Sequence, residues 1–283
     1  MEKLSRLERM GGWVAAAGFA VFAAMVADNA LAATSIAASK HNLGTTGTGS
    51  VRVTTGTDEV CVFCHTPHGG DTTKSAPLWN RGVNAPASYT LYDGLWGDRP
   101  STFDGETATG GVGSISLLCL SCHDGATALD MLINAPGSGG YNATGASAGY
   151  TWQNVVSTNL MDPARIATIG TDLKNDHPIS VPYCGGMKSG GAAVPTTIAN
   201  CKDQDFNAPA TGSGLYWIET GTANGTREKT DLPLYVRAFG GTTAGPWPAV
   251  ECGSCHDPHN ADTPTFLRIA NTQSQVCLSC HVK

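Results

Sequence analysis

Four copies of one short pattern, two cysteines separated by two residues and followed at once by a histidine, use eight of the ten cysteines in this 283-residue chain. The copies are Cys61/Cys64/His65, Cys119/Cys122/His123, Cys252/Cys255/His256 and Cys277/Cys280/His281. This C-x-x-C-H pattern is the attachment signature of c-type haem, in which both thiols bond to the porphyrin and the histidine ligates the iron. A zinc site competes for a single copy, but zinc gives no reason for a histidine after every second cysteine. The repetition therefore predicts four covalently bound haems.

The two remaining cysteines, Cys184 and Cys201, lie in a stretch rich in glycine. In an oxidising compartment a leftover pair is most simply a disulfide. Closing a loop of this size is worth about 3 kcal/mol in the chain-entropy model. A catalytic or redox role is the alternative for this pair.

The eight histidines divide into two sets of four. Four follow the cysteine pairs, and four others remain to serve as sixth ligands of four irons: His41, His68, His177 and His259. We interpret all four haems as bis-histidine. Any one of the four could instead be an ordinary surface or core histidine. A methionine would then take its place and raise that haem's potential; the candidates are Met131, Met161 and Met187.

The second histidine of "CVFCHTPH" cannot share an iron with the first. His65 and His68 are three residues apart, so on a short helix they share one face. The two axial ligands of an iron approach from opposite sides of the porphyrin, which so short a segment cannot encircle. The same reasoning separates His259 from His256 in "CGSCHDPH". Each octapeptide thus indicates two haems lying close together.

An internal repeat organises the chain, because each C-x-x-C-H-x-P-H segment is followed by a C-L-S-C-H segment. We expect two diheme modules, about residues 41–123 and 252–281, joined by a wrapping region, 125–251, that carries His177 and the disulfide. Within the modules, we expect His68 to reach the haem of His123. We expect His259 to reach the haem of His281.

The first 32 residues resemble a secretory signal peptide, with a basic start, an apolar run over residues 11–27 and a small-residue ending. An uncleaved membrane anchor is the alternative, although the run is near the lower length limit for a span. Cleavage would leave one exported domain, residues 33–283, with no membrane span. The formal net charge of −6 argues against a nucleic-acid partner.

His41 lies on the N-terminal arm of the expected mature chain, and His281 lies two residues from the other end. If the arm of one subunit supplied an axial ligand to the next, the contact would be head-to-tail. Such a contact builds an open filament when it does not close into a ring. Ligation within one chain is the alternative, and the sequence leaves the choice open.

Several stretches, "SKHNLG", "CVFCHTPHGG", "APLWNR", "CLSCHDG", "NDHPIS" and "CGSCHDPHN", resemble the multihaem cytochromes with paired C-x-x-C-H motifs. Within that group, the ligand pattern is similar to the tetrahaem extracellular cytochrome filament family, the cytochrome nanowires. The resemblance spans about residues 40–281, although the connecting region matches only at "NDHPIS". It implies a chain of bis-histidine haems carrying electrons out of the cell, with one axial histidine from the adjacent subunit, for which His41 is the candidate. Soluble periplasmic relatives share the motifs.

The expected fold is a multihaem cytochrome c, mostly irregular, with short α-helices at the C-x-x-C-H motifs and a few short strands around a haem stack. Strands are expected near "LYWIE" and "YTWQNV". The expected function is electron transfer to redox partners or extracellular acceptors, without catalysis, by a subunit of a secreted filament at the cell surface. A discrete periplasmic or surface-bound shuttle is the first alternative. A multihaem reductase, which would need an open haem, is the second.

Overall fold

The computed structural model describes residues 35–82, 89–92, 111–137, 140–191, 195, 197–240, 243 and 245–282. The expected signal peptide, residues 1–32, lies outside them. Residues 35–283 group as one unit. Across the described residues, no helix is long and apolar enough to cross a membrane.

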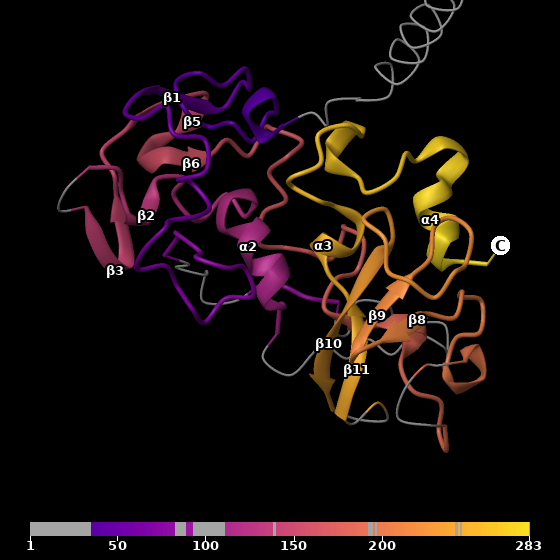
Figure 1. Cartoon of the computed structure of the whole chain (residues 1–283). Helices are drawn as coiled ribbons and strands as arrows, with labels where there is room; N and C mark the ends of the chain where they lie inside the picture. The colour runs from indigo at the N-terminus through magenta and orange to yellow at the C-terminus, as the bar shows by residue number, and fades with distance from the viewer. Residues whose placement is uncertain are drawn as a thin grey trace, which may run out of the picture. The chain divides into compact units, whose positions relative to one another are not determined.

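The first part of the chain is built from three small antiparallel strand pairs around one helix (Figure 1). The paired strands are β1 (Arg52–Thr55) with β4 (Thr151–Gln153), β2 (Met131–Asn134) with β3 (Tyr141–Ser147), and β5 (Val155–Val156) with β6 (Leu160–Met161). The helix is α2 (Ser114–His123), which ends at the second haem motif. A core that includes Val53, Phe63, Leu132 and Trp152 lies beneath these strands. The pair of β1 with β4 brings residues around 52 and 152 together, and this pairing holds the chain next to the first motif in place.

The second part contains a five-stranded antiparallel sheet (Figure 1). Its order is β7 (Val181–Pro182), β11 (Gly245–Val250), β10 (Leu232–Phe239), β9 (Leu215–Ile218) and β8 (Ala210–Gly212). The Cys184–Cys201 disulfide, with its Cα atoms 5.6 Å apart, belongs to the same buried core as Trp247 and Ala249. The disulfide therefore closes its loop against a packed sheet.

The sheet leads directly into the third haem motif. Strand β11 ends at Val250, Glu251 caps the next helix, and α3 (Cys252–Cys255) is the motif itself. The fourth motif lies in α4 (Gln275–Cys280). The 3-10 turns are η2 (Ile36–Ala38), η3 (Ser157–Asn159), η4 (Tyr183–Gly185), η5 (Ile198–Asn200), η7 (Pro264–Phe266) and η8 (Thr272–Ser274).

The fold has more sheet than the sequence indicated. Strands form at both expected stretches, in β9 and in β4 with β5. The region 125–251, expected to wrap around the haems, holds the whole five-stranded sheet. Short helices occur at three motifs, whereas the first, residues 61–65, is a turn. The framework around the motifs is therefore a protein core with its own hydrogen-bonded ladders.

Candidate haem-binding sites

One helical turn presents both thiols of each motif. Cysteines three residues apart lie on the same side of a helix, and the histidine that follows closes the turn by donating its backbone N–H to the carbonyl of the first cysteine. These bonds are His65 to Cys61 at 2.7 Å, His256 to Cys252 at 3.0 Å and His281 to Cys277 at 2.9 Å. The first motif therefore shares this closing hydrogen bond with α3 and α4, although its residues form a turn and not a helix.

Three of the four motif histidines are held by a backbone carbonyl at Nδ1. A carbonyl oxygen carries no hydrogen, so Nδ1 must donate and Nε2 is left with its lone pair free. The bonds are His65 to Pro77 O at 2.8 Å, His123 to Ala167 O at 2.7 Å and His256 to Thr265 O at 2.8 Å. Metal-ligating histidines are typically oriented in this way by a second hydrogen bond. The residues thus fit an iron ligated through Nε2.

The remaining histidines come close to motif histidines in pairs. The ring centres of His65 and His259 are 6.1 Å apart, and those of His123 and His41 are 6.3 Å apart. A metal–imidazole bond is about 2.0 Å long and the ring centre lies about 1.1 Å behind its nitrogen, so two imidazoles on opposite sides of one iron have centres about 6 Å apart. Both separations fit bis-histidine ligation.

The fourth motif has a partner at a similar separation. The ring centres of His281 and His177 are 6.5 Å apart. The His177 ring also makes a 3.0 Å hydrogen bond between Nδ1 and the carbonyl of Pro178, which again leaves Nε2 free. Three motif histidines therefore each face one of the four extra histidines.

This pairing differs from the one expected from the sequence. His259 faces His65, where His281 was expected, and His123 faces His41, where His68 was expected. For His41, the sequence left open whether it serves its own chain or a neighbouring one, and its ring lies against His123 of its own chain. The difference arises because the segment after the third motif folds back toward the first, which local spacing does not reveal. Among the described residues, neither His68 nor His256 has a ring contact with another histidine.

His41 has an environment suited to a neutral ligand. Its ring stacks on Phe266 with centres 4.2 Å apart and planes 6° apart. Desolvation by burial, and secondly the neighbouring His123, lower the pKa of His41 to about 4. A histidine must be neutral to ligate a metal, and this environment keeps the imidazole neutral without the metal's help.

The cysteines of successive motifs are neighbours, so the motifs follow one another in space as they do in sequence. The pKa of Cys64, although part of its surface is exposed, is raised to about 12 by desolvation and then by Cys122. A hydrogen bond with Cys252 is the main cause of the raised pKa of Cys119. A third pair of neighbouring cysteines lies where the third motif meets the fourth.

At that junction the pKa of Cys280 is raised to about 12 by burial and then by Cys255. Each motif thus has one cysteine near a cysteine of the next motif, and the second and third motifs use a different cysteine for each neighbour. Four cofactors attached at these positions would lie in a single unbranched row.

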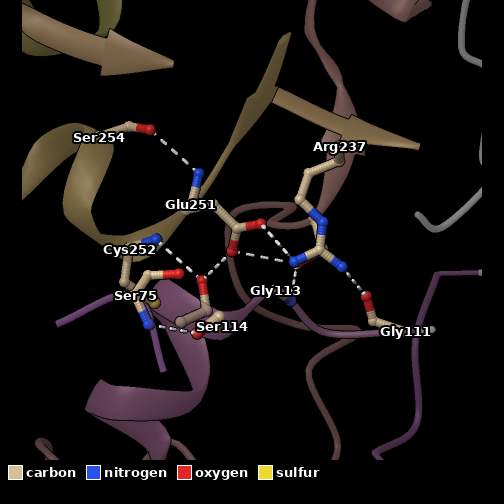
Figure 2. Close-up of polar contacts among 10 residues, drawn as sticks. Ser75, Gly111, Gly113, Ser114, Arg237, Glu251, Cys252 and Ser254 are labelled. Atoms are coloured by element: carbon tan, nitrogen blue, oxygen red, sulfur yellow. Dashed lines mark hydrogen bonds and ion pairs between the residues drawn. The ribbon is translucent and has the colours of Figure 1, made fainter. Parts of the chain in front are cut away.

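A buried polar network holds the second and third motifs together (Figure 2). Glu251, 1% exposed, accepts hydrogen bonds from Ser116 of α2 and from Ser180 Oγ at 3.1 Å, and lies 3.9 Å from Arg237 Nη1. Ser116 Oγ also accepts the backbone N–H of Cys252 at 3.1 Å. Burial raises the pKa of Glu251, against the serine and arginine contacts that lower it. One carboxylate therefore fastens both haem-bearing helices.

Sequence reasoning missed two kinds of residue. The carbonyls of Pro77, Ala167 and Thr265 gave no signal, because every residue type carries the same carbonyl. Glu251 and the buried Arg81 did give one, as charged residues within largely uncharged stretches, but their burial depends on the fold.

Residues 245–283 match the family described as the doubled CXXCH motif. They contain the third and fourth motifs, Cys252–His256 and Cys277–His281. This segment is a paired c-type haem-binding motif. The match supports a multihaem c-type cytochrome, a class that binds haem covalently and transfers electrons. No curated protein matches the chain.

Proposed function

We propose that the chain binds four c-type haems and conducts electrons along them. The observation that carries this proposal is the coincidence of two independent arrangements: an unbroken row of neighbouring cysteines from the first motif to the fourth, and three histidine pairs with centres 6.1 to 6.5 Å apart. The haem supplies a one-electron iron couple when bound. The thiols would fix each cofactor, and the carbonyl-bonded imidazoles would orient the axial ligands.

Electron transfer without catalysis is the second element of the proposal. Two histidines per iron leave no coordination position for a substrate, which argues against the alternative of a multihaem reductase. Imidazole ligands also favour lower potentials than a histidine–methionine pair. The grouping of residues 35–283 as one unit supports a single tetrahaem domain.

The haem count and ligation are tested together on protein expressed with a haem-attachment system. The intact mass should correspond to four haems per chain, and the oxidised protein should have only low-spin spectra when its ligands are complete. A mass corresponding to two haems per chain, both attached within residues 245–283, would contradict the tetrahaem proposal. A high-spin signal in fully assembled protein would revive the reductase.

We further propose that the chain forms a head-to-tail polymer in which His68 of one subunit completes the iron held by His256 of the next. These two histidines support the proposal because each lacks a ring partner among the described residues, and because His68 is exposed. His41, the sequence-based candidate for this role, lies against His123 instead. A heterologous contact of this type extends indefinitely unless it closes into a ring. With the expected signal peptide, this gives a secreted filament for extracellular electron transfer.

A matched pair of variants separates the polymer from a discrete periplasmic or surface shuttle. His68→Ala and His259→Ala should each leave one iron per chain without its sixth ligand, giving similar high-spin signals. Only His68→Ala should abolish filaments in electron micrographs, because His259 serves an iron in its own chain. Discrete particles from the haem-loaded parent protein would favour the shuttle.

A further inference from the structure

Arg81 is a fully buried cation between the first two haem motifs. Its exposed fraction is 0%, and its guanidinium makes four hydrogen bonds, all with neutral acceptors. The acceptors are Ser121 Oγ at 3.0 Å, Ser121 O at 2.7 Å, Leu129 O at 2.7 Å and Ala128 O at 2.9 Å. These acceptors orient the charge without neutralising it.

No carboxylate among the described residues lies within ion-pair distance of Arg81. The two buried acids of the same region, Asp124 and Asp130, are engaged with hydroxyl, amide and backbone donors instead. A guanidinium stays protonated in proteins, and burying an unpaired charge is costly. The four hydrogen bonds leave this charge without a counter-ion in the described part of the chain, so the buried charge calls for a function.

The position of Arg81 points to the first two haems. The preceding residue, Asn80, donates its backbone N–H to the carbonyl of Cys64 at 2.9 Å. The guanidinium itself binds Ser121, which is adjacent to Cys122 of the second motif. The positive charge opposes the desolvation that raises the pKa of Cys64, which places its field at the first attachment site. The pair Asn80–Arg81 thus spans the junction between the two motifs.

We propose that Arg81 is a fixed positive charge that raises the reduction potentials of the haems attached at Cys61–His65 and Cys119–His123. This inference rests on the proposed tetrahaem function. Reduction adds one electron to an iron and moves no proton to or from Arg81. A neighbouring positive charge in a poorly screened interior therefore favours the reduced state. The row of haems would then carry a built-in difference in potential between its first and second halves.

The test is a spectroelectrochemical titration of the haem-loaded protein. Arg81→Gln should lower two of the four midpoints by at least a tenfold change in the one-electron equilibrium, about 59 mV. The shift should be equal at pH 6 and pH 9, because guanidinium does not titrate in that range. Arg81→Lys, which keeps the charge, should retain most of the parent potential. Arg227→Gln, which removes an exposed charge, should leave all four midpoints in place because solvent screens it.

A second variant covers the case in which Arg81→Gln does not accumulate. Ser121→Asp keeps the guanidinium and gives it an anion, so it should lower the same two midpoints. Four loaded haems with unchanged midpoints in Arg81→Gln or Ser121→Asp would overturn the inference, as would an Arg81→Lys shift as large as that of Arg81→Gln. Failure of the tetrahaem proposal would be visible separately, as missing haem mass in the parent protein.

Discussion

Replacing Glu251 by alanine should destabilise the protein by about 3–5 kcal/mol, because removing one partner of a buried ion pair leaves the other uncompensated. The carboxylate is 1% exposed, and the side chain of Arg237, 3.9 Å away, is 19% exposed. Alanine would also deprive the hydroxyls of Ser116 and Ser180 of their common acceptor. Because Ser116 belongs to α2 and Glu251 caps α3, the loss should loosen the junction between the second and third motifs.

Replacing Glu251 by glutamine keeps the shape of the side chain and removes its ability to carry a negative charge. Glu251→Gln keeps an acceptor oxygen, so it should cost only about 1–2 kcal/mol near neutral pH. Burial raises the pKa of Glu251, so its stabilising contribution is fully present below the ordinary carboxyl pKa and is lost as the pH rises through the raised value. Glutamine stays neutral throughout. The stability difference between parent and Glu251→Gln should therefore narrow as the pH rises above the ordinary carboxyl pKa.

Both variants can be measured on the haem-loaded protein by chemical denaturation followed by far-ultraviolet circular dichroism. Circular dichroism in the haem absorption band adds a readout of how neighbouring haems are oriented, which should change in Glu251→Ala and be preserved in Glu251→Gln. An alanine variant within about 1 kcal/mol of the parent, with an unchanged haem band, would refute the argument, since a single hydrogen bond is worth that much.

Three other substitutions test a ligand, the disulfide and the sheet core. His259→Ala should open the iron held by His65, and its high-spin signal should vanish when that haem's two attachment cysteines are also removed; a persisting signal would contradict the pairing. Replacing both Cys184 and Cys201 by serine should lower the free energy of unfolding, measured by calorimetry, by about 3 kcal/mol, because the disulfide closes a loop with a sequence separation of 17. An unchanged melting curve would count against a closed loop. Trp247→Ala should lower the free energy of unfolding in denaturant by about 3–5 kcal/mol, because the Trp247 side chain is only 1% exposed. A decrease of less than about 1 kcal/mol would contradict the packing.

The attachment residues could be predicted from the sequence because the chemistry of a C-x-x-C-H motif is local. The axial partners could not. His259 is three residues from His256 of the motif, and this spacing argues against both histidines ligating one iron. Which other iron it approaches depends on the path of the chain through the whole unit, and its ring lies against His65.

The strands β10 and β11 of the five-stranded sheet were missed for a different reason. Pro233 lies in β10, and Pro246 and Pro248 lie in β11. Proline lacks the N–H that a ladder needs, so its presence argues against an interior strand. Here all three prolines pair with residues of adjacent strands, Pro233 with Trp217 and the other two with residues of β10. Buried residues such as Leu234 and Trp247 compensate for the missing donors.

The contact between Cys119 and Cys252 has a consequence for the order of assembly. Two free thiols within hydrogen-bonding reach are converted readily to a disulfide by an oxidant or an exchange partner. A chain that folded before receiving its cofactors in an oxidising medium would cross-link these two residues and block two attachment sites at once. Thioether formation removes both thiols from this competition. If both cysteines carry haem, as proposed, attachment has to precede the tertiary folding that brings them together.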